Sequence, residues 1–246
     1  MLRLYHICAY WFALLAFGAV ALALNAVCAV LLILPGRKRR APAIREAIRR
    51  LFDKWIGGLH AFRLVTVTWH GLDEAPLARP AVYVANHPSL IDATILLAQL
   101  PDAVCVFKPA LSRNPLLAPA ALMAGYSSGS AGVDLVRDLA GKVAAGCTLL
   151  IFPEGTRTAG ADGFNRLKPG FALIARRARV PVQVLIIRTD RKLLTGGPLP
   201  WLRPPRFPVH FDVHVDRLLP FDPDISCEQR VAEVETIFAA RLRASP

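Results

Sequence analysis

The pattern of apolar and polar residues divides the chain into three segments, of which the first is a long apolar run. Residues 7–34 contain no charged side chain and a single strongly polar one, Asn25. A helix needs ~20 apolar residues to cross a bilayer, and this run is longer. It therefore predicts a membrane helix, and we assign residues 1–40 to a transmembrane anchor with its basic flank.

A cleavable signal peptide is the alternative interpretation of this run. Signal peptides carry an apolar core of ~7–15 residues with positive charges ahead of it. Here only Arg3 precedes the run, whereas Arg37-Lys38-Arg39-Arg40 follows it directly. Positive charges beside a membrane helix stay in the cytoplasm. This order favours a retained anchor, with the rest of the chain on the cytoplasmic face of the inner membrane.

The second segment, residues 41–63, has the periodicity of an amphipathic helix. Charged residues occupy one side of it. Apolar residues recur every three to four positions on the other side, at Ile44, Ile48, Leu51, Phe52, Trp55, Leu59 and Phe62. The helix either lies among lipid headgroups or packs on the domain that follows. Its basic charge and Trp55 favour the membrane.

The third segment, residues 64–246, alternates between strand-like and helical patterns. The predicted strands are 64–70, 81–86, 103–107, 147–152, 182–188 and 208–216, and the predicted helices are 89–100, 110–124, 133–145, 169–178 and 226–243. This alternation is typical of a layered α/β domain with a mostly parallel central sheet. Ligands of such sheets bind where the loops at the carboxyl ends of the strands converge.

Composition narrows the range of partners. The formal net charge is +12, from 30 Lys and Arg against 18 Asp and Glu. Either a nucleic acid or an anionic membrane leaflet would suit this charge, and a solvated basic surface without such a partner is the structural alternative. The basic residues are spread along the chain without a nucleic-acid motif, so the apolar run favours the membrane and no nucleic acid. Five cysteines form no C-x-x-C pair, which favours free thiols over a zinc site or a disulfide framework.

One candidate for catalysis lies in "AVYVANHPSLID", residues 81–92, where a run of β-formers leads into His87 and Asp92. An imidazole with a carboxylate partner is the usual pattern of a general base. The structural alternative is strong, because residues 89–92 also fit the capping-box signature. In that case Asp92 only caps the following helix.

A second motif is "LLIFPEGTRT", residues 149–158, in which Glu154-Gly155-Thr156-Arg157 follows an apolar strand. Gly155 allows a tight turn or a close approach to a ligand, and the Arg157 guanidinium suits a phosphate. Lys168 brings another cation to the start of a predicted helix, where free N–H groups favour anions. An ordinary surface loop with a Glu–Arg pair is the alternative.

NHPSLID (86–92) and FPEGTR (152–157) together resemble the first and third blocks of the glycerolipid acyltransferase family, the lysophosphatidic acid acyltransferase group. The resemblance covers residues 65–190. It implies transfer of a fatty acyl group from acyl-CoA or acyl-carrier protein to a lysolipid hydroxyl, such as that of 1-acylglycerol-3-phosphate, without a metal or cofactor. It also implies that His87 is the general base and Asp92 its partner. The implied acceptor-binding residues are Asn86, Glu154, Gly155, Thr156, Arg157 and Lys168.

The chain departs from the family pattern in the second block, which usually reads G-x-x-F-x-x-R. The corresponding "GYSSGSA" (125–131) has Ala131 in place of the Arg that helps hold the acceptor phosphate. The fourth block keeps Pro181 but has Val184 near the position of its second proline. A different acceptor, such as a specialised glycolipid or a polyene lipid, is therefore an alternative. Arg137 is a candidate replacement cation, although a solvated helix face suits it better.

Residues 125–129 also satisfy G-x-S-x-G, the nucleophile elbow of α/β-hydrolases, with Ser127 as the nucleophile. The elbow requires a strand before it, whereas "LLAPAALMAG" predicts a helix. Asp190 and His210 are only nominal triad partners. A serine hydrolase is thus the less favoured alternative to an acyltransferase.

His210, Asp212, His214 and Asp216 alternate along a predicted strand and so share one face of it. A metal site is one interpretation of this pattern. A solvent-facing polar strand is the favoured one.

Overall fold

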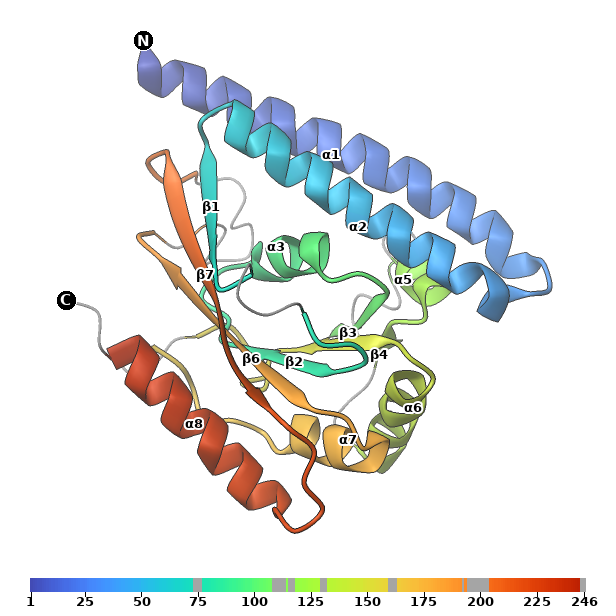
Figure 1. Ribbon diagram of the computed structural model, residues 1–246. Helices are drawn as coiled ribbons and strands as arrows, with labels where there is room; N and C mark the ends of the chain where they lie inside the picture. Colours follow the sequence, from blue (N-terminus) through green and yellow to red (C-terminus); the bar gives the residue numbers. More distant parts are fainter. Residues whose placement is uncertain are drawn as a thin grey trace.

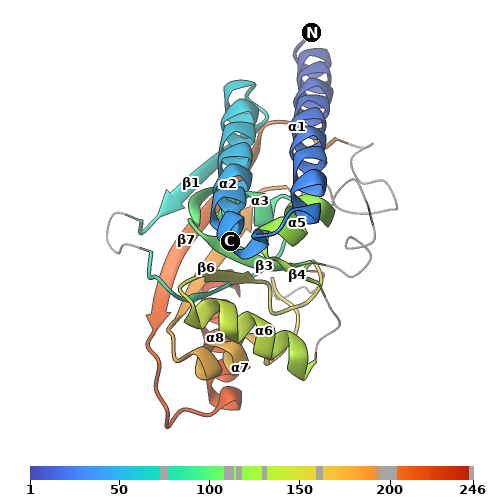
Figure 2. The same ribbon diagram turned by 90° about the vertical axis from the view of Figure 1, so that its right-hand side faces the viewer.

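The computed structural model describes residues 1–72, 77–107, 114, 118–128, 132–158, 163–191, 193 and 204–243. Within these residues a central sheet is covered by helices on both faces (Figures 1 and 2). The helices are α1 (Leu2–Ile33), α2 (Arg37–Ala61), α3 (Asp92–Gln99), α5 (Ala118–Ala124), α6 (Val133–Ala144), α7 (Gly170–Ala178) and α8 (Cys227–Arg243). The strands are β1 (Val65–His70), β2 (Val82–Ala85), β3 (Ala103–Phe107), β4 (Ser127–Ser128), β5 (Thr148–Ile151), β6 (Val182–Thr189) and β7 (Val209–Leu219).

The sheet has the strand order β1-β7-β6-β2-β5-β3-β4. Every neighbouring pair is parallel except β6 and β7, which are antiparallel. The prediction of a layered α/β domain with a mostly parallel sheet is therefore confirmed. Because β2 lies between β5 and β6 in parallel, the residues that follow these three strands meet at one edge of the sheet.

Apolar side chains pack on both faces of the sheet, which explains why its central strands read as continuous hydrophobic runs. On β2, Tyr83 and Ala85 face the layer formed by α1, α2 and α3, whereas Val82 and Val84 face α6, α7 and α8. All four side chains are fully buried. This rigid strand holds the loop that begins at Asn86.

The helices α1 and α2 lie side by side above the sheet (Figure 1). Near its start, α1 buries Ala9, Tyr10 and Ala13 in the same core as β1. Near its end, Asn25 accepts a hydrogen bond from the Ala120 backbone N–H at 3.0 Å. One flank of α1 therefore contacts the domain near both ends of the helix, and the one strongly polar residue within the apolar run is used in that contact.

Two members of the basic cluster bind backbone carbonyls at helix ends. Arg40 donates to the carbonyls of Leu34 at 2.8 Å and Pro35 at 2.7 Å, at the end of α1. Arg37 donates through Nε to the carbonyl of Leu122 in α5 at 3.0 Å. Cations at these positions satisfy carbonyls that have no partner within the helix. The cluster is also the first turn of α2, so the amphipathic helix begins earlier than residue 41.

Some other predictions differ from the structure or fall outside it. The two-residue strand β4 was not predicted, because an element this short leaves no periodicity to detect. Of the predicted helix 110–124, the structure describes residue 114 and the helix α5. Ala131 and residues 194–203 lie outside the described residues.

Candidate active site

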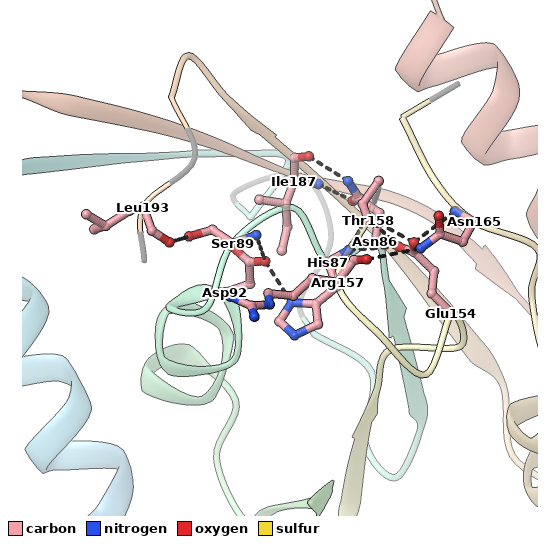
Figure 3. Close-up of polar contacts among 10 residues, drawn as sticks. All are labelled: Asn86, His87, Ser89, Asp92, Glu154, Arg157, Thr158, Asn165, Ile187 and Leu193. Atoms are coloured by element: carbon pink, nitrogen blue, oxygen red, sulfur yellow. Dashed lines mark hydrogen bonds and ion pairs between the residues drawn. The ribbon is translucent and has the colours of Figure 1, made fainter. Parts of the chain in front are cut away.

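His87 and Asp92 meet at the carboxyl edge of the sheet. His87 lies in the loop after β2, and Asp92 is the first residue of α3. The imidazole Nδ1 lies 2.8 Å from Asp92 Oδ2, which also accepts the Ser89 backbone N–H at 2.6 Å (Figure 3). The carboxylate thus binds the turn before α3 and the imidazole at the same time. The predicted capping box is not formed, because α3 begins at Asp92 itself, its N-cap Ile91 makes no side-chain cap hydrogen bond, and the Ser89 hydroxyl bonds to Leu193.

The Asp92 carboxylate is fully buried, and among the described residues its second oxygen, Oδ1, has no hydrogen-bond partner. Burial raises the pKa of Asp92 to about 6, although the hydrogen bonds from His87 and Ser89 lower it in part. At neutral pH the group is a carboxylate that water does not solvate. Its negative charge therefore interacts strongly with the His87 ring, which is hydrogen-bonded to it.

The His87 ring stacks on Phe152, with ring centroids 4.1 Å apart and an angle of 20° between the planes. Phe152 directly follows β5, the strand next to β2. The side chain of His87 is 17% exposed. Its Nε2 points away from Asp92 (Figure 3), so one ring nitrogen is held by the carboxylate and the other is turned away from it. The sequence motif indicates the histidine but not the aromatic ring on which it stacks.

Glu154 lies at the junction of the two motifs and is only 3% exposed. Its Oε1 accepts the His87 backbone N–H at 3.0 Å and the Thr158 hydroxyl at 2.7 Å. Its Oε2 accepts the Asn165 backbone N–H at 2.8 Å. Both carboxylate oxygens therefore bind the protein itself. Sequence reasoning identified Glu154 but not Thr158 or Asn165, whose contacts with it come from tertiary structure.

Asn86 is bound in both directions to the neighbouring strand. Its amide donates to the Ile187 carbonyl at 2.8 Å and accepts the Ile187 N–H at 2.7 Å, and the side chain is buried. Ser89, also fully buried, donates its hydroxyl to the Leu193 carbonyl. The polar groups of these two residues thus fasten the His87 loop to β6 and to Leu193.

The remaining predicted site residues surround the glycine turn. Gly155 has φ +68°, and a Cβ at this position would lie 2.5 Å from Lys168 Nζ. Lys168 and Thr156 are exposed, and Arg157 is half-buried. The Arg157 side chain extends toward the side of the loop where the His87 ring lies (Figure 3). The structure thus brings Arg157 and Lys168 to the loop that also fixes the His87 backbone.

The hydrolase alternative is not supported by the geometry. The helix α5, rather than a strand, precedes Ser127, and the Ser127 hydroxyl bonds to Asp138 at 2.6 Å and Lys142 at 2.7 Å. Asp190 accepts the backbone N–H of His210 and not its ring.

The predicted metal site on β7 and the candidate cation Arg137 are not supported by their surroundings either. His70 and Asp212 form an exposed pair on β1 and β7, and no group of side chains suited to a metal ion exists among the described residues. Arg137 pairs with Asp134 on the exposed face of α6.

Fold and site together place a buried imidazole–carboxylate pair at the carboxyl edge of a mostly parallel α/β sheet. Residues 66–188, half of the chain, match the family model described as Acyltransferase. The chain belongs to this acyltransferase family.

Several characterised proteins are similar to the chain. A 1-acyl-sn-glycerol-3-phosphate acyltransferase of Cocos nucifera is 30% identical over 49% of this chain and 39% of that protein. The enzyme of the same name from Helicobacter pylori is 30% identical over 47% of this chain and 52% of that protein. The chain thus spans about half the length, or less, of these curated relatives. The crystal structure of the 1-acyl-sn-glycerophosphate acyltransferase PlsC from Thermotoga maritima has the same fold. It has a TM-score of 0.74 at 20% identity and covers 100% of this chain and 99% of that one.

Proposed function

We propose that the protein transfers a fatty acyl group from acyl-CoA or acyl-carrier protein to the free hydroxyl of a 1-acylglycerol-3-phosphate-like lysolipid. The observation that carries this proposal is the 2.8 Å contact between His87 Nδ1 and a fully buried Asp92 carboxylate. The names of the similar proteins support the acceptor class.

The reaction requires a base because an alcohol is a poor nucleophile until its proton is removed. His87 Nε2 takes the hydroxyl proton while the oxygen attacks the thioester carbonyl. Asp92, bound at Nδ1, keeps the proton on that nitrogen and stabilises the imidazolium that forms. When the carbon–sulfur bond breaks, the imidazolium returns its proton to the thiolate. The products are an ester and a free thiol, and His87 is neutral again.

The acceptor phosphate would bind at the glycine turn. Arg157 offers a planar fork for phosphate oxygens, and Lys168 adds a second cation close to Gly155. Lys168 also lies just before α7, whose first N–H groups favour an anion. A Cβ at position 155 would collide with the Lys168 ammonium group. Glycine at this position therefore leaves room for that group in the site.

We further propose that α1 binds the membrane through its exposed flank. This helix is long and apolar enough to cross a bilayer, yet its other flank packs on the domain near both of its ends. The outward side chains include Phe12, Leu15, Val20, Val27 and Val30. If this flank inserts while the packed flank stays on the domain, α1 lies along the cytoplasmic leaflet of the inner membrane, which differs from the transmembrane anchor that the sequence predicts. Lys38 and Arg39, both exposed, would meet anionic headgroups there.

The proposal is tested with the full chain in lipid vesicles, supplied with acyl-CoA or acyl-carrier protein and a panel of acceptors. The panel contains 1-acylglycerol-3-phosphate, a lysolipid with a neutral headgroup, and a glycolipid. We expect ester formation with the phosphorylated acceptor. Activity with the neutral acceptors alone would overturn the acceptor class, and no activity with any acceptor would overturn the proposed reaction.

The role of the cation is tested by Arg157→Ala. This change should raise the KM for a phosphorylated acceptor by about tenfold and alter kcat less, because it removes binding rather than the base. An unchanged KM would show that the phosphate does not bind Arg157.

A further inference from the structure

Two residues outside the predicted site, Thr158 and Asn165, are bound to the buried carboxylate of Glu154. We propose that they are positioning residues: Thr158 fixes the main chain of His87, and Asn165 fixes the main chain of Arg157. Glu154 joins the two, so that the base and the cation lie at a set separation. This inference rests on the proposed function, because it assigns the base and the phosphate-binding cation to opposite ends of one acceptor.

Thr158 contacts the main chain of His87 through its hydroxyl and through its backbone N–H. The Thr158 hydroxyl accepts the His87 N–H at 3.2 Å, and the Thr158 N–H donates to the His87 carbonyl at 2.8 Å. The same hydroxyl donates to Glu154 Oε1, which also accepts the His87 N–H. Residue 158 therefore holds the peptide groups on both sides of the His87 Cα. The main chain of His87 therefore cannot rotate, and its imidazole cannot move, without breaking these hydrogen bonds.

Asn165 acts on the other end of the loop. Its backbone N–H donates to Glu154 Oε2 at 2.8 Å, and its side-chain amide donates to the Arg157 carbonyl at 3.1 Å. Asn165 lies in the segment between the glycine loop and α7. The same segment contains Lys168. The side chain of residue 165 thus ties the peptide after Arg157 to the segment that presents the second cation.

Glu154 is well suited to be the shared centre of this cluster. It is 3% exposed, and each of its oxygens accepts at least one hydrogen bond from the protein. Hydrogen bonds to an ionised acceptor are roughly twice as strong as neutral ones. A buried carboxylate that lost these donors would also be costly to keep desolvated. The arrangement therefore resists any shift of one motif relative to the other.

A fixed separation has a chemical consequence for the acceptor. Its hydroxyl must reach His87 Nε2 while its phosphate reaches Arg157, and small errors in such geometry reduce rates strongly. The two positioning residues should therefore affect different kinetic constants. Thr158 acts through the base and should affect kcat, whereas Asn165 acts through the cation and should affect the KM for the acceptor.

The first experiment removes the Thr158 hydroxyl with Thr158→Val, which keeps the shape of the side chain. We expect kcat to fall by about 10- to 100-fold, with the acceptor KM changed by less than about threefold. Exchange of the His87 amide hydrogen, followed by mass spectrometry, should quicken by about tenfold. Thr158→Ser restores the hydroxyl and should recover kcat to within about threefold of the parent chain.

The second experiment removes the Asn165 amide with Asn165→Ala, which leaves the backbone N–H to Glu154 in place. We expect the acceptor KM to rise by about five- to tenfold while kcat stays within about threefold. Exchange at His87 should stay unchanged. The control is Thr236→Val on α8, because the Thr236 hydroxyl donates only to Ala232 in its own helix among the described residues. This control should leave both constants and the exchange unchanged.

The outcomes separate this inference from the proposed function. If the parent chain is active and loses activity in His87→Ala, the function stands. If Thr158→Val and Asn165→Ala then change kcat and KM in the same proportion, or neither at all, the positioning roles are wrong. Failure of Thr158→Ser to restore kcat would likewise overturn the role of the hydroxyl. An inactive parent chain with faster exchange at His87 in Thr158→Val would contradict the function while supporting the positioning role of Thr158.

Discussion

Among the residues that the structure describes, two His–Asp pairs have nearly the same length and different surroundings. In one, His87 Nδ1 lies 2.8 Å from Asp92, and the two side chains are 17% and 0% exposed. In the other, His70 Nε2 lies 3.0 Å from Asp212, and the side chains are 45% and 47% exposed. The first pair lies at the carboxyl edge of parallel strands. The second pair joins β1 to β7 on the sheet face.

Burial, rather than the distance between the side chains, distinguishes the two pairs. Water screens the Asp212 charge, and a surface pair of this kind contributes little. Asp92 has no such screening, so its charge acts on one imidazole. The second pair also has a competing neighbour: the His70 ring stacks on His214 with centroids 4.3 Å apart. Burial lowers the pKa of His214, and the charges of His70 and Arg188 lower it further. This cluster fits a polar sheet face and not a catalytic base.

The largest expected effect comes from removing each imidazole in turn. His87→Ala should lower the acyl-transfer rate by about 10²–10⁴-fold, because the acceptor hydroxyl loses its base. His70→Ala should leave the rate within about twofold of the parent, since no step of the proposed reaction uses it. Steady-state assays and circular dichroism on both variants check this. An active, folded His87→Ala chain would remove the basis of the mechanism.

The two carboxylates should differ in the same direction by a smaller factor. Asp92→Asn keeps the shape of the side chain but removes the charge that stabilises the imidazolium, so kcat should fall by roughly 10- to 100-fold. Asp212→Asn should have no measurable effect on kcat. Equal effects of the two substitutions would show that burial does not distinguish the pairs.

The acid side of the pH profile should report the buried pair. Below a pH of about 6 Asp92 takes up a proton, because burial raises its pKa to about 6. A neutral Asp92 no longer stabilises the imidazolium that forms on His87 during the reaction. We expect kcat/KM to fall by about fivefold between pH 6 and pH 5, measured at saturating donor in vesicles. A flat profile over this range would contradict the raised pKa.

The smallest expected effect is on stability. A carboxyl group with a raised pKa in the folded state destabilises that state once it ionises. The loss is absent below the unfolded-state pKa of 3.8 and complete above about 6. Asp92→Asn removes the buried charge and should raise the free energy of unfolding at pH 7 by about 1–2 kcal/mol. The gain in Tm should vanish near pH 4. A lower Tm for Asp92→Asn at pH 7 would show that the charge stabilises the fold.

Much of the fold could be predicted because its elements have local signatures. The continuous apolar runs of β2, β5 and β6 and the alternation of elements indicated a parallel α/β sheet, and the short motifs identified His87, Asp92 and Arg157. The reversed direction of β7 was not predictable in this way. A strand has the same pattern of inward and outward side chains whichever way it runs.

The long-range contacts of the site were also not predictable from the sequence. Thr158 and Asn165 are ordinary polar residues in sequence, and only the folded chain brings both to Glu154. The sequence predicts Phe152 only as the last residue of a strand, whereas in the structure its ring stacks on the His87 ring. Asn86 and Glu154 were expected to bind the acceptor. In the structure their polar groups bind Ile187, His87, Thr158 and Asn165, and their contact with the acceptor stays a prediction.

The sequence by itself determined the class of fold, the chemistry available to the site and the apolar character of α1, because these depend on residue type and on spacing along the chain. The tertiary structure decided which of two similar His–Asp pairs is buried. It also decided that α1 presents one flank outward while the other packs on the domain. Burial depends on contacts between residues far apart in sequence, and such contacts leave no periodic signal in either segment.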